Sequence, residues 1–195
     1  METFEFPKIH SFPPLYTKQP NATVLQQQLD SWCSIILSYC EYYKVSTIST
    51  TGTIVYSQFE ELKIDTLPPI FENKQINRAV DDEFKSDIIK HLIHKLNKAE
   101  YINTKIPDQG ILVYWKSLAD WATILYDFVE NSGQLGTVLT IYELTKSEDS
   151  GLPESLKNLD YNLLVKVLKN ILIKQGKAQI LMQEGTDQIG GVKIV

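Results

Sequence analysis

A chain of 195 residues with 43% hydrophobic and 22% charged side chains has the composition of a globular protein and not of a disordered one. Its formal net charge of −5 disfavours a sequence-independent attraction to nucleic acid or to anionic lipid surfaces. Arg78 is the only arginine, so the side chain best suited to bidentate recognition of guanine and phosphate is almost absent.

Residues 1–20 are rich in proline and aromatic side chains, and we predict that they form an extended arm. Proline fixes its own φ angle and disfavours helix at the preceding residue, which favours extended or polyproline II backbone. The prolines of the arm are Pro7, Pro13, Pro14 and Pro20.

The most specific signal in the arm is the run Phe12, Pro13, Pro14, Leu15 and Tyr16. A polyproline II segment loses little entropy when it docks into an aromatic-lined groove, so such runs often serve as protein ligands. A Pro-Pro-x-Tyr sequence alone is weak evidence, because it also arises by chance or as a ligand of WW domains. Here it directly precedes a capped helix, and we predict that the arm docks on a partner protein.

Residues 21–115 follow the order of a winged-helix domain, in which helices are followed by a two-stranded wing. Asn21 or Thr23 can cap the first helix, and Gly52 marks a turn within a β-branched segment. The predicted elements are a helix over about 21–44, strands within 45–57, a helix over about 74–98, and wing strands over 101–106 and 111–115.

Residues 116–195 repeat this order, with two helix starts that carry capping-box pairs. Ser117 pairs with Asp120, and Thr140 pairs with Glu143. The predicted elements are helices over 117–133, 141–145 and 159–175, a polar break at 146–153, and a terminal hairpin of 178–182 with 190–195.

The predicted fold class is therefore mainly α with small β-hairpins (α+β). We expect two tandem winged-helix domains, 21–115 and 116–195, preceded by the extended arm of residues 1–20.

The two cysteines, Cys33 and Cys40, are seven residues apart on the first predicted helix. Their separation of roughly 10 Å along the axis exceeds the ~7 Å Cα limit for a disulfide. We expect free, buried thiols in a reducing compartment. The N-terminus carries no signal-peptide pattern and no run of about 18 apolar residues occurs, so we expect a cytosolic protein.

Metal binding and catalysis have little support in the sequence. His91, His94 and Asp87 share one side of the second predicted helix, as a metal site would need, but a solvated polar face is the simpler interpretation. His10 lies in the arm, and no nucleophile with an activating base and no phosphate-cradling glycine loop is recognisable. We predict a protein that is not an enzyme and that uses no cofactor and no metal.

Three lysines, Lys166, Lys169 and Lys174, lie on the helix that a DNA-binding winged-helix protein inserts into the major groove. A winged-helix DNA-binding transcriptional regulator is therefore the alternative function. The net negative charge of the chain and the apolar residues Val165 and Ile173 argue against this function. The three lysines could instead form a solvated face or a contact with another protein. A salt-dependent gel shift on arbitrary duplex DNA separates the two classes.

The same helix is more apolar than a one-sided helix requires. Leu164, Leu168, Ile171 and Leu172 suffice for a core stripe. The additional apolar surface, including the stems of two lysines, comes from Val165, Lys166, Lys169 and Ile173. We predict that these four residues form a protein contact if the apolar pair continues into the hairpin strands.

The run FPPLYTKQPN, with Leu29, Trp32 and Cys33 downstream, resembles the family of vacuolar protein-sorting-associated protein 25, the small subunit of the endosomal ESCRT-II complex. The runs WKSLADWATILYDFVENSG and VLTIYELT resemble it too, so the likeness spans both halves, and we expect a fungal member. Residues 50–69 show no such likeness.

The resemblance implies a non-catalytic subunit of a complex that sorts ubiquitinated cargo into multivesicular bodies. Two copies of the subunit join one copy each of two larger subunits, and Pro13, Pro14 and Tyr16 would enter a pocket on each, supported by Phe12 and Leu15. The second winged-helix domain would recruit the nucleating subunit of ESCRT-III. The implied protein is cytoplasmic, binds no nucleic acid, and reaches the endosomal membrane only through partners.

Overall fold

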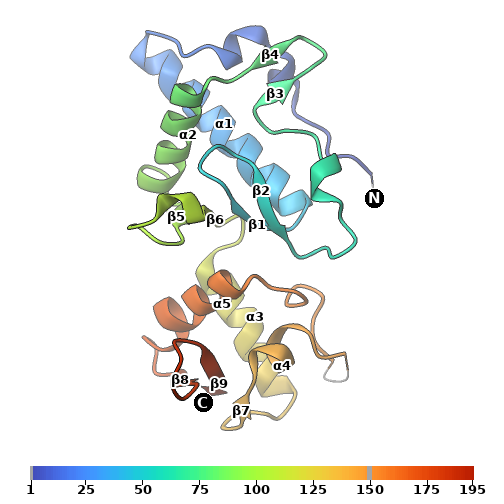
Figure 1. Ribbon diagram of the computed structural model, residues 1–195, viewed down its shortest axis with the longest axis vertical. Helices are drawn as coiled ribbons and strands as arrows, with labels where there is room; N and C mark the ends of the chain where they lie inside the picture. The colour runs from blue at the N-terminus through green and yellow to red at the C-terminus, as the bar shows by residue number, and fades with distance from the viewer. Residues whose placement is uncertain (1, 149–150) are drawn as a thin grey trace. The chain divides into compact units, whose positions relative to one another are not determined.

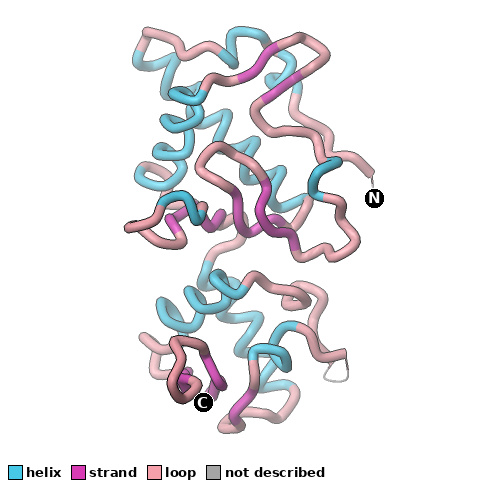
Figure 2. Tube along the Cα trace, viewed as in Figure 1, coloured by secondary structure: helices cyan, strands magenta, loops and turns pink. Residues whose placement is uncertain are grey.

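The computed structural model describes residues 2–148 and 151–195, and the chain divides into two compact units, Met1–Trp115 and Lys116–Val195 (Figure 1). Each unit combines helices with a small antiparallel sheet, as the tube in Figure 2 shows. The predicted fold class, mainly α with small β-hairpins in two winged-helix arrangements, is confirmed. Of the predicted polar break at 146–153, residues 149 and 150 lie outside the described residues.

The first unit packs two helices over a four-stranded antiparallel sheet of order β2-β1-β6-β5. Helices α1 and α2 lie side by side (Figure 1). The helices and strands are α1 (Ala22–Tyr42), β1 (Val45–Ile48), β2 (Ile54–Ser57), β3 (Glu72–Asn73), β4 (Arg78–Ala79), α2 (Asp82–His94), β5 (Ala99–Tyr101) and β6 (Ile111–Val113).

Helix α1 begins at its predicted cap. The side chain of Asn21 accepts hydrogen bonds from the backbone N–H groups of Thr23 and Val24, at 3.0 and 3.1 Å, which satisfies two donors that the first turn leaves free. The buried side of the helix carries aromatic, aliphatic and thiol side chains that form the centre of the first core: Trp32, Cys33, Ile35, Ile36, Tyr39 and Cys40.

Helix α2 is shorter than the sequence pattern predicted. It begins at Asp82 and not near residue 74, because Asp81 caps it by accepting from Phe84 N at 2.8 Å. The preceding residues form the β3–β4 hairpin, whose turn includes Asn77 with a φ of 51°. A positive φ ends any helical path, and asparagine tolerates it better than most residues, so periodicity alone extended the helix too far.

The second unit has a three-stranded antiparallel sheet of order β7-β9-β8, and its wing is the predicted terminal hairpin. Both predicted capping residues are in place: Ser117 accepts from Asp120 N, and Thr140 and Glu143 form a reciprocal capping box. The elements are α3 (Leu118–Asn131), β7 (Val138–Leu139), α4 (Ile141–Thr145), α5 (Tyr161–Val167), the π-helical segment η5 (Leu168–Leu172), β8 (Ala178–Met182) and β9 (Ile189–Ile194).

The long C-terminal helix differs from a regular α-helix in its second half. Asp160 caps α5, and the chain then widens into η5, where Ile173 N donates to Leu168 O, five residues back, at 2.8 Å. The wider turn shifts the buried side relative to the 3.6-residue period. Ile171, which lies in η5 and which we predicted as a core residue, is only half-buried, and Leu163 and Val167 of α5 belong to the core in addition to the predicted residues.

The N-terminal segment also differs from the expectation. It belongs to the first unit, and two short 3-10 helices, η1 (Lys8–Ser11) and η2 (Pro13–Tyr16), replace the predicted extended backbone. Proline at the first position of η2 needs no N–H partner there, and its fixed φ suits the turn. The prediction of a free extended arm is wrong for both halves, because Phe4 and Phe6 pack against the first core and Leu15 and Tyr16 are part of it.

Candidate functional site

The proline-rich segment (Phe12–Tyr16) divides its side chains between the core and the surface. Leu15 and Tyr16 are buried, with 2% and 4% of their surface exposed, whereas Phe12 exposes 56% and both prolines are exposed. The 3-10 turn causes this division, because it points Leu15 and Tyr16 toward α1 and leaves the other three residues outside. The structure therefore does not bring all five predicted docking residues to one surface.

Tyr16 is held in the core by a hydrogen bond and an aromatic contact. Its hydroxyl donates to His10 O at 2.7 Å, and its ring packs edge-on against Trp32 at a centroid distance of 5.2 Å. Burial raises the pKa of Tyr16 to about 12, so the hydroxyl remains protonated and can serve as the donor. Tyr16 thus acts as an internal anchor of the segment.

Side chains of α1 hold the backbone of the segment. Trp32 Nε1 donates to Leu15 O at 3.0 Å, and the amide of Gln28 donates to Pro14 O and Thr17 O at 3.0 and 2.8 Å. The same amide accepts from Gln19 N at 3.1 Å. These bonds tie the backbone of the segment and of the residues after it to the side chains of α1.

His10, two residues before the proline-rich segment, holds the chain against the β3–β4 hairpin. Its Nε2 donates to Ile70 O at 3.0 Å, its ring stacks on Phe6 at 3.9 Å, and Asn73 donates to its carbonyl oxygen at 3.1 Å. Burial lowers the pKa of His10 below its ordinary value, so the ring is neutral near pH 7. The sequence placed His10 in a free arm and gave no signal of this role.

The exposed part of the segment borders a shallow hollow of about 340 Å³. Phe12 and Pro14 line it together with Val24, which is in the first turn of α1. Ile9, Phe12 and Val24 are exposed apolar residues, and together they make an apolar surface at this end of the unit. Sequence reasoning missed Ile9, which lies between Lys8 and His10, and Val24, which lies outside the apolar face predicted for the first helix.

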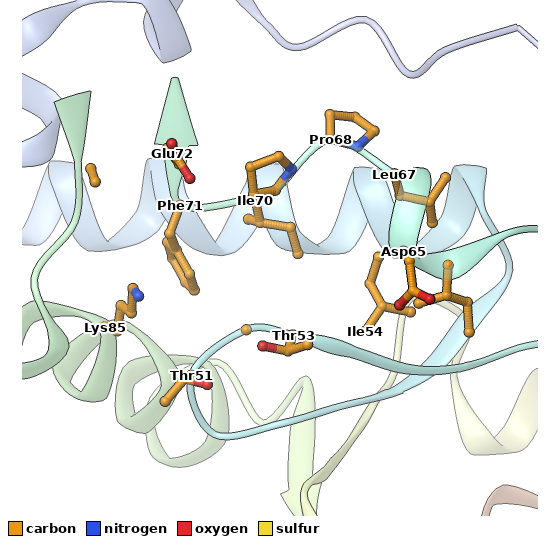
Figure 3. A pocket seen from close by; sticks show the side chains of 14 residues that line it. Thr51, Thr53, Ile54, Asp65, Leu67, Pro68, Ile70, Phe71, Glu72 and Lys85 are labelled. Atoms are coloured by element: carbon orange, nitrogen blue, oxygen red, sulfur yellow. The ribbon is translucent and has the colours of Figure 1, made fainter. Parts of the chain in front are cut away.

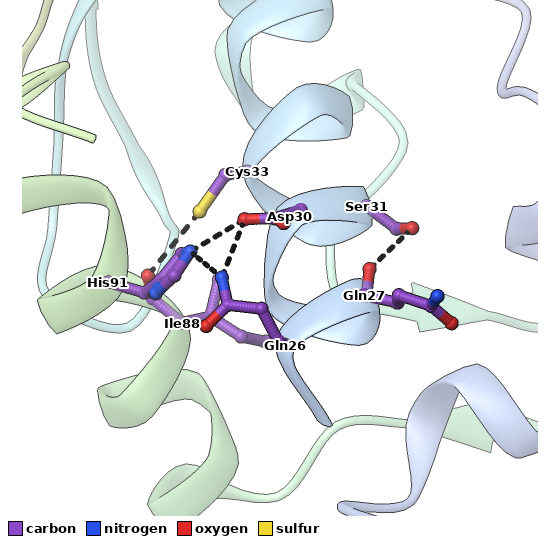
Figure 4. Close-up of polar contacts among 7 residues, drawn as sticks. All are labelled: Gln26, Gln27, Asp30, Ser31, Cys33, Ile88 and His91. Carbon is purple, nitrogen blue, oxygen red and sulfur yellow. Dashed lines mark hydrogen bonds and ion pairs between the residues drawn. The ribbon is translucent and has the colours of Figure 1, made fainter. Parts of the chain in front are cut away.

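The histidine and acidic residues of α2 are arranged differently from the predicted solvated face. His91 is buried, and its Nε2 lies 2.7 Å from Asp30 Oδ1 on α1, next to the amide of Gln26 (Figure 4). His94 is exposed, and Asp87 forms an ion pair with Lys18 at 2.7 Å. His91 therefore links two helices of the core, so the prediction of a solvated face is wrong for His91 and holds for His94.

The two cysteines are free and buried, as predicted. Cys33 Sγ donates to Ile88 O at 3.7 Å across the interface of α1 and α2 (Figure 4). Burial raises the pKa of the Cys33 thiol to about 12 and also raises that of Cys40, so both remain protonated at neutral pH. A protonated, buried thiol is a poor nucleophile, which suits a structural role.

Residues 50–69, which show no likeness to the family in sequence, build the β1–β2 turn, strand β2 and a loop. The turn faces Leu67–Glu72 across a hollow of about 330 Å³ (Figure 3). At its closest approach Gly52, with a φ of 84°, lies so near the Phe71 ring that a Cβ would overlap it. The glycine is thus required twice, by its φ angle and by the contact.

In the second unit the four predicted contact residues differ in exposure. Lys169 is exposed and Ile173 exposes 37% of its surface, whereas Val165 and Lys166 are half-buried. On the edge strand β8, Leu181 and Met182 expose 47% and 53%. They belong to the continuous apolar run Ile180, Leu181 and Met182, which gave no sign that this edge faces solvent.

Comparison with known proteins gives consistent matches over the whole chain. The family model described as "ESCRT-II complex subunit" matches residues 9–160. Vacuolar protein-sorting-associated protein 25 of Homo sapiens is 32% identical over 179 residues, which cover 92% of each chain. The protein of the same name from Saccharomyces cerevisiae is 28% identical over 201 residues, covering 97% of this chain and 98% of the other.

Solved structures agree with these matches. The crystal structure of subunit VPS25 of the endosomal trafficking complex ESCRT-II superimposes with a TM-score of 0.81 at 30% identity. A chain in the crystal structure of the endosomal complex ESCRT-II (VPS22/VPS25/VPS36) gives a TM-score of 0.77 at 29% identity. Both comparisons cover 97% of this chain and 98% of the other.

Proposed function

The chain belongs to the family of ESCRT-II complex subunits, and from this premise we propose that it is a non-catalytic subunit of such a complex. It joins two larger subunits, two copies of this chain per complex, in the endosomal sorting of ubiquitinated cargo into multivesicular bodies. Similarity over almost the full length to a chain solved with VPS22 and VPS36 supports this assembly. The proposal takes precedence over the DNA-binding regulator, which the net charge of −5 also disfavours.

The docking role of the proline-rich segment rests on one observation. Phe12, Pro13 and Pro14 form an exposed apolar group on a backbone that is already fixed from below by Leu15 and Tyr16. A fixed apolar group binds with a small loss of conformational entropy, which is the general advantage of a preorganised contact. In this proposal the larger subunits contact Phe12, Pro13 and Pro14, and Leu15 and Tyr16 act as internal anchors.

Size argues for a contribution from the neighbouring surface. A specific interface buries about 800 Å² per partner, more than three residues supply. Ile9 and Val24 adjoin Phe12 and Pro14 around the same hollow and extend the apolar area. They are the flanking contact in this proposal.

Recruitment of the ESCRT-III nucleating subunit is assigned to the second unit. Ile173, with the exposed lysine Lys169 four residues before it, offers an apolar contact beside a positive charge. An acidic amphipathic helix is the kind of partner that such a surface fits. Val165 and Lys166 are half-buried and contribute at its border.

Attachment to the endosome is assigned to the partners of this chain. In the part of the chain that the structure describes, no helix is both long and apolar enough to cross a membrane. The contact with the membrane is therefore indirect in this proposal.

The docking role is tested by the double substitution Phe12→Ala with Pro13→Ala. We expect co-purification with tagged larger subunits to weaken at least about tenfold, because the exposed apolar group is lost while its anchors remain. The matched control is Ile106→Ala with Pro107→Ala, an exposed pair that likewise opens a 3-10 helix in the same unit. Unchanged co-purification of the Phe12 and Pro13 variant would contradict the docking role.

The role of the second unit is tested in the full-length chain. The substitutions Lys169→Glu and Ile173→Ser are expected to reduce binding of the ESCRT-III nucleating subunit and its dependence on salt, while assembly with the larger subunits persists. Lys146→Glu, also exposed in this unit, is the charge-matched control. Equal binding by both variants would place the ESCRT-III contact elsewhere.

A further inference from the structure

One buried amide makes an unusual number of contacts with the proline-rich segment. Gln28, only 6% exposed, donates to Pro14 O at 3.0 Å and to Thr17 O at 2.8 Å, and accepts from Gln19 N at 3.1 Å. All three partners are backbone groups, between nine and fourteen residues away along the chain. Both N–H donors of the amide and its oxygen are therefore used on one stretch of backbone.

We infer that Gln28 is the positioning residue that holds the proline-rich segment on α1 in the conformation in which it binds its partner. The segment has little hydrogen bonding of its own: Leu15 N donates to Phe12 O at 3.0 Å and Thr17 N to Pro14 O at 3.3 Å. These bonds define local turns and do not fix where the turns lie. The placement on α1 depends on side chains of that helix.

Gln28 acts at a different point from the other anchors. Tyr16 and Trp32 hold the segment within the hydrophobic core, and Lys18 reaches Asp87 on α2 through an exposed ion pair, a contact that is worth little in water. Gln28 contacts the backbone at Pro14, directly beside the exposed group, and continues to Thr17 and Gln19. Gln28 also lines the hollow beside Phe12 and Pro14, but it is only 6% exposed, so its main effect is on the position of the exposed prolines.

Glutamine is required by the pattern of partners. Two carbonyl oxygens need donors, and one N–H needs an acceptor, which only a carboxamide supplies at this length. Glutamate in its place would turn a carboxylate toward two carbonyl oxygens, whereas methionine would fill a similar volume and make none of the bonds. The three partners lie at exposed or half-buried residues, so water can replace the amide and the core need not unfold.

This inference rests on the proposed docking function, because it predicts how binding depends on a residue that is almost fully buried and acts on the backbone of the segment. If only a fraction of the molecules hold the segment in place, the apparent dissociation constant rises by the inverse of that fraction. The association rate falls by the same factor, and the dissociation rate stays unchanged because the contact residues are intact.

The test uses the full-length variants Gln28→Met and Gln28→Glu, with Gln109→Met as an exposed control in the same unit. Amide hydrogen exchange at Gln19 should accelerate in both Gln28 variants, whereas exchange at the buried Ile36 of α1 should not. Binding to the larger subunits should weaken about tenfold in Gln28→Met, through the association rate, and further in Gln28→Glu. Gln109→Met should behave as the unchanged chain does.

Two outcomes would overturn the inference. Faster exchange at Gln19 with unchanged affinity would mean that the position of the segment is irrelevant to binding. Faster exchange with tighter binding would mean that the segment leaves α1 in order to dock. In either case, loss of binding by the Phe12 and Pro13 variant would still support the docking function, so the two failures can be told apart.

Discussion

In the first unit, buried side chains hold an irregular segment in place, whereas in the second unit the exposed apolar residues lie on elements with their own backbone hydrogen bonds. Gln28, Trp32 and Asn73 each donate to a backbone carbonyl of residues 10–17. Ile173 follows directly on η5, and Leu181 lies on β8, which pairs with β9.

This difference predicts which substitutions will disturb each surface. A segment fixed by side chains can be displaced by a substitution beneath it, far from any partner. A surface on a helix and a strand is changed mainly by substitutions on it, because its backbone is held by regular hydrogen bonds. The first unit should therefore respond strongly to changes at residues that no partner contacts.

The largest expected effect is at the internal anchor Tyr16. Tyr16→Ala should lower the free energy of unfolding of the first unit by about 3 kcal/mol or more, because it leaves a cavity against Trp32 and removes the bond to His10 O. Phe12→Ala, four residues before it and 56% exposed, should change it by less than about 0.5 kcal/mol. Urea unfolding followed by tryptophan fluorescence measures both.

The variants Phe12→Ala and Tyr16→Ala should also differ in their effect on binding. Phe12→Ala should weaken co-purification with the larger subunits at unchanged stability. If Tyr16→Ala leaves stability unchanged and affects only binding, the tyrosine is a contact residue and the division between anchor and contact is wrong.

A smaller effect is expected from two glycines, one in each unit. Gly52→Ala should destabilise the first unit by roughly 2–3 kcal/mol, because the new Cβ must adopt a positive φ and also displace the Phe71 ring. Gly133→Ala in the second unit has the same φ problem but no atom within 4 Å, so about 1 kcal/mol is expected. Thermal melting of both variants tests the difference, and equal losses would remove the special role of the Phe71 contact.

The smallest expected effect is on the pH dependence of stability. It concerns the first unit alone, because all three histidines lie in that unit. Burial lowers the pKa of His10 in the folded state, so the unfolded chain takes up the proton first as the pH falls. This contribution to stability is present above the unfolded value near 6.5 and is lost as the pH falls toward the folded pKa.

The measurement is the slope of unfolding free energy between pH 7 and pH 5. His10→Phe should flatten the slope of the first unit relative to the unchanged chain, because it removes a group whose pKa is lowered on folding. A slope that is the same in both proteins would show that His10 does not titrate differently on folding. The second unit has no histidine and serves as an internal reference.

Local chemistry in the sequence determined the starts of α1, α3 and α4, the terminal hairpin and the fold class. Asn21, Ser117 and Thr140 cap helices because their side-chain oxygens accept from free N–H groups a few residues away, an interaction that needs no distant partner. The terminal hairpin and the helical faces likewise follow from apolar spacing, and specific runs of residues carried the family resemblance.

Tertiary structure alone decided which residues of the proline-rich segment face the core and where the long helix widens. The burial of Tyr16 depends on Trp32, His10 and Asn73, which lie up to 63 residues away along the chain from one another. The same is true of His91, whose burial follows from Asp30 on the other helix, 61 residues away. The period of the apolar residues predicts which side chains share one face of a helix or strand. It does not predict which distant segment packs on that face. Only this packing decides which residues of the proline-rich segment are buried and which are exposed.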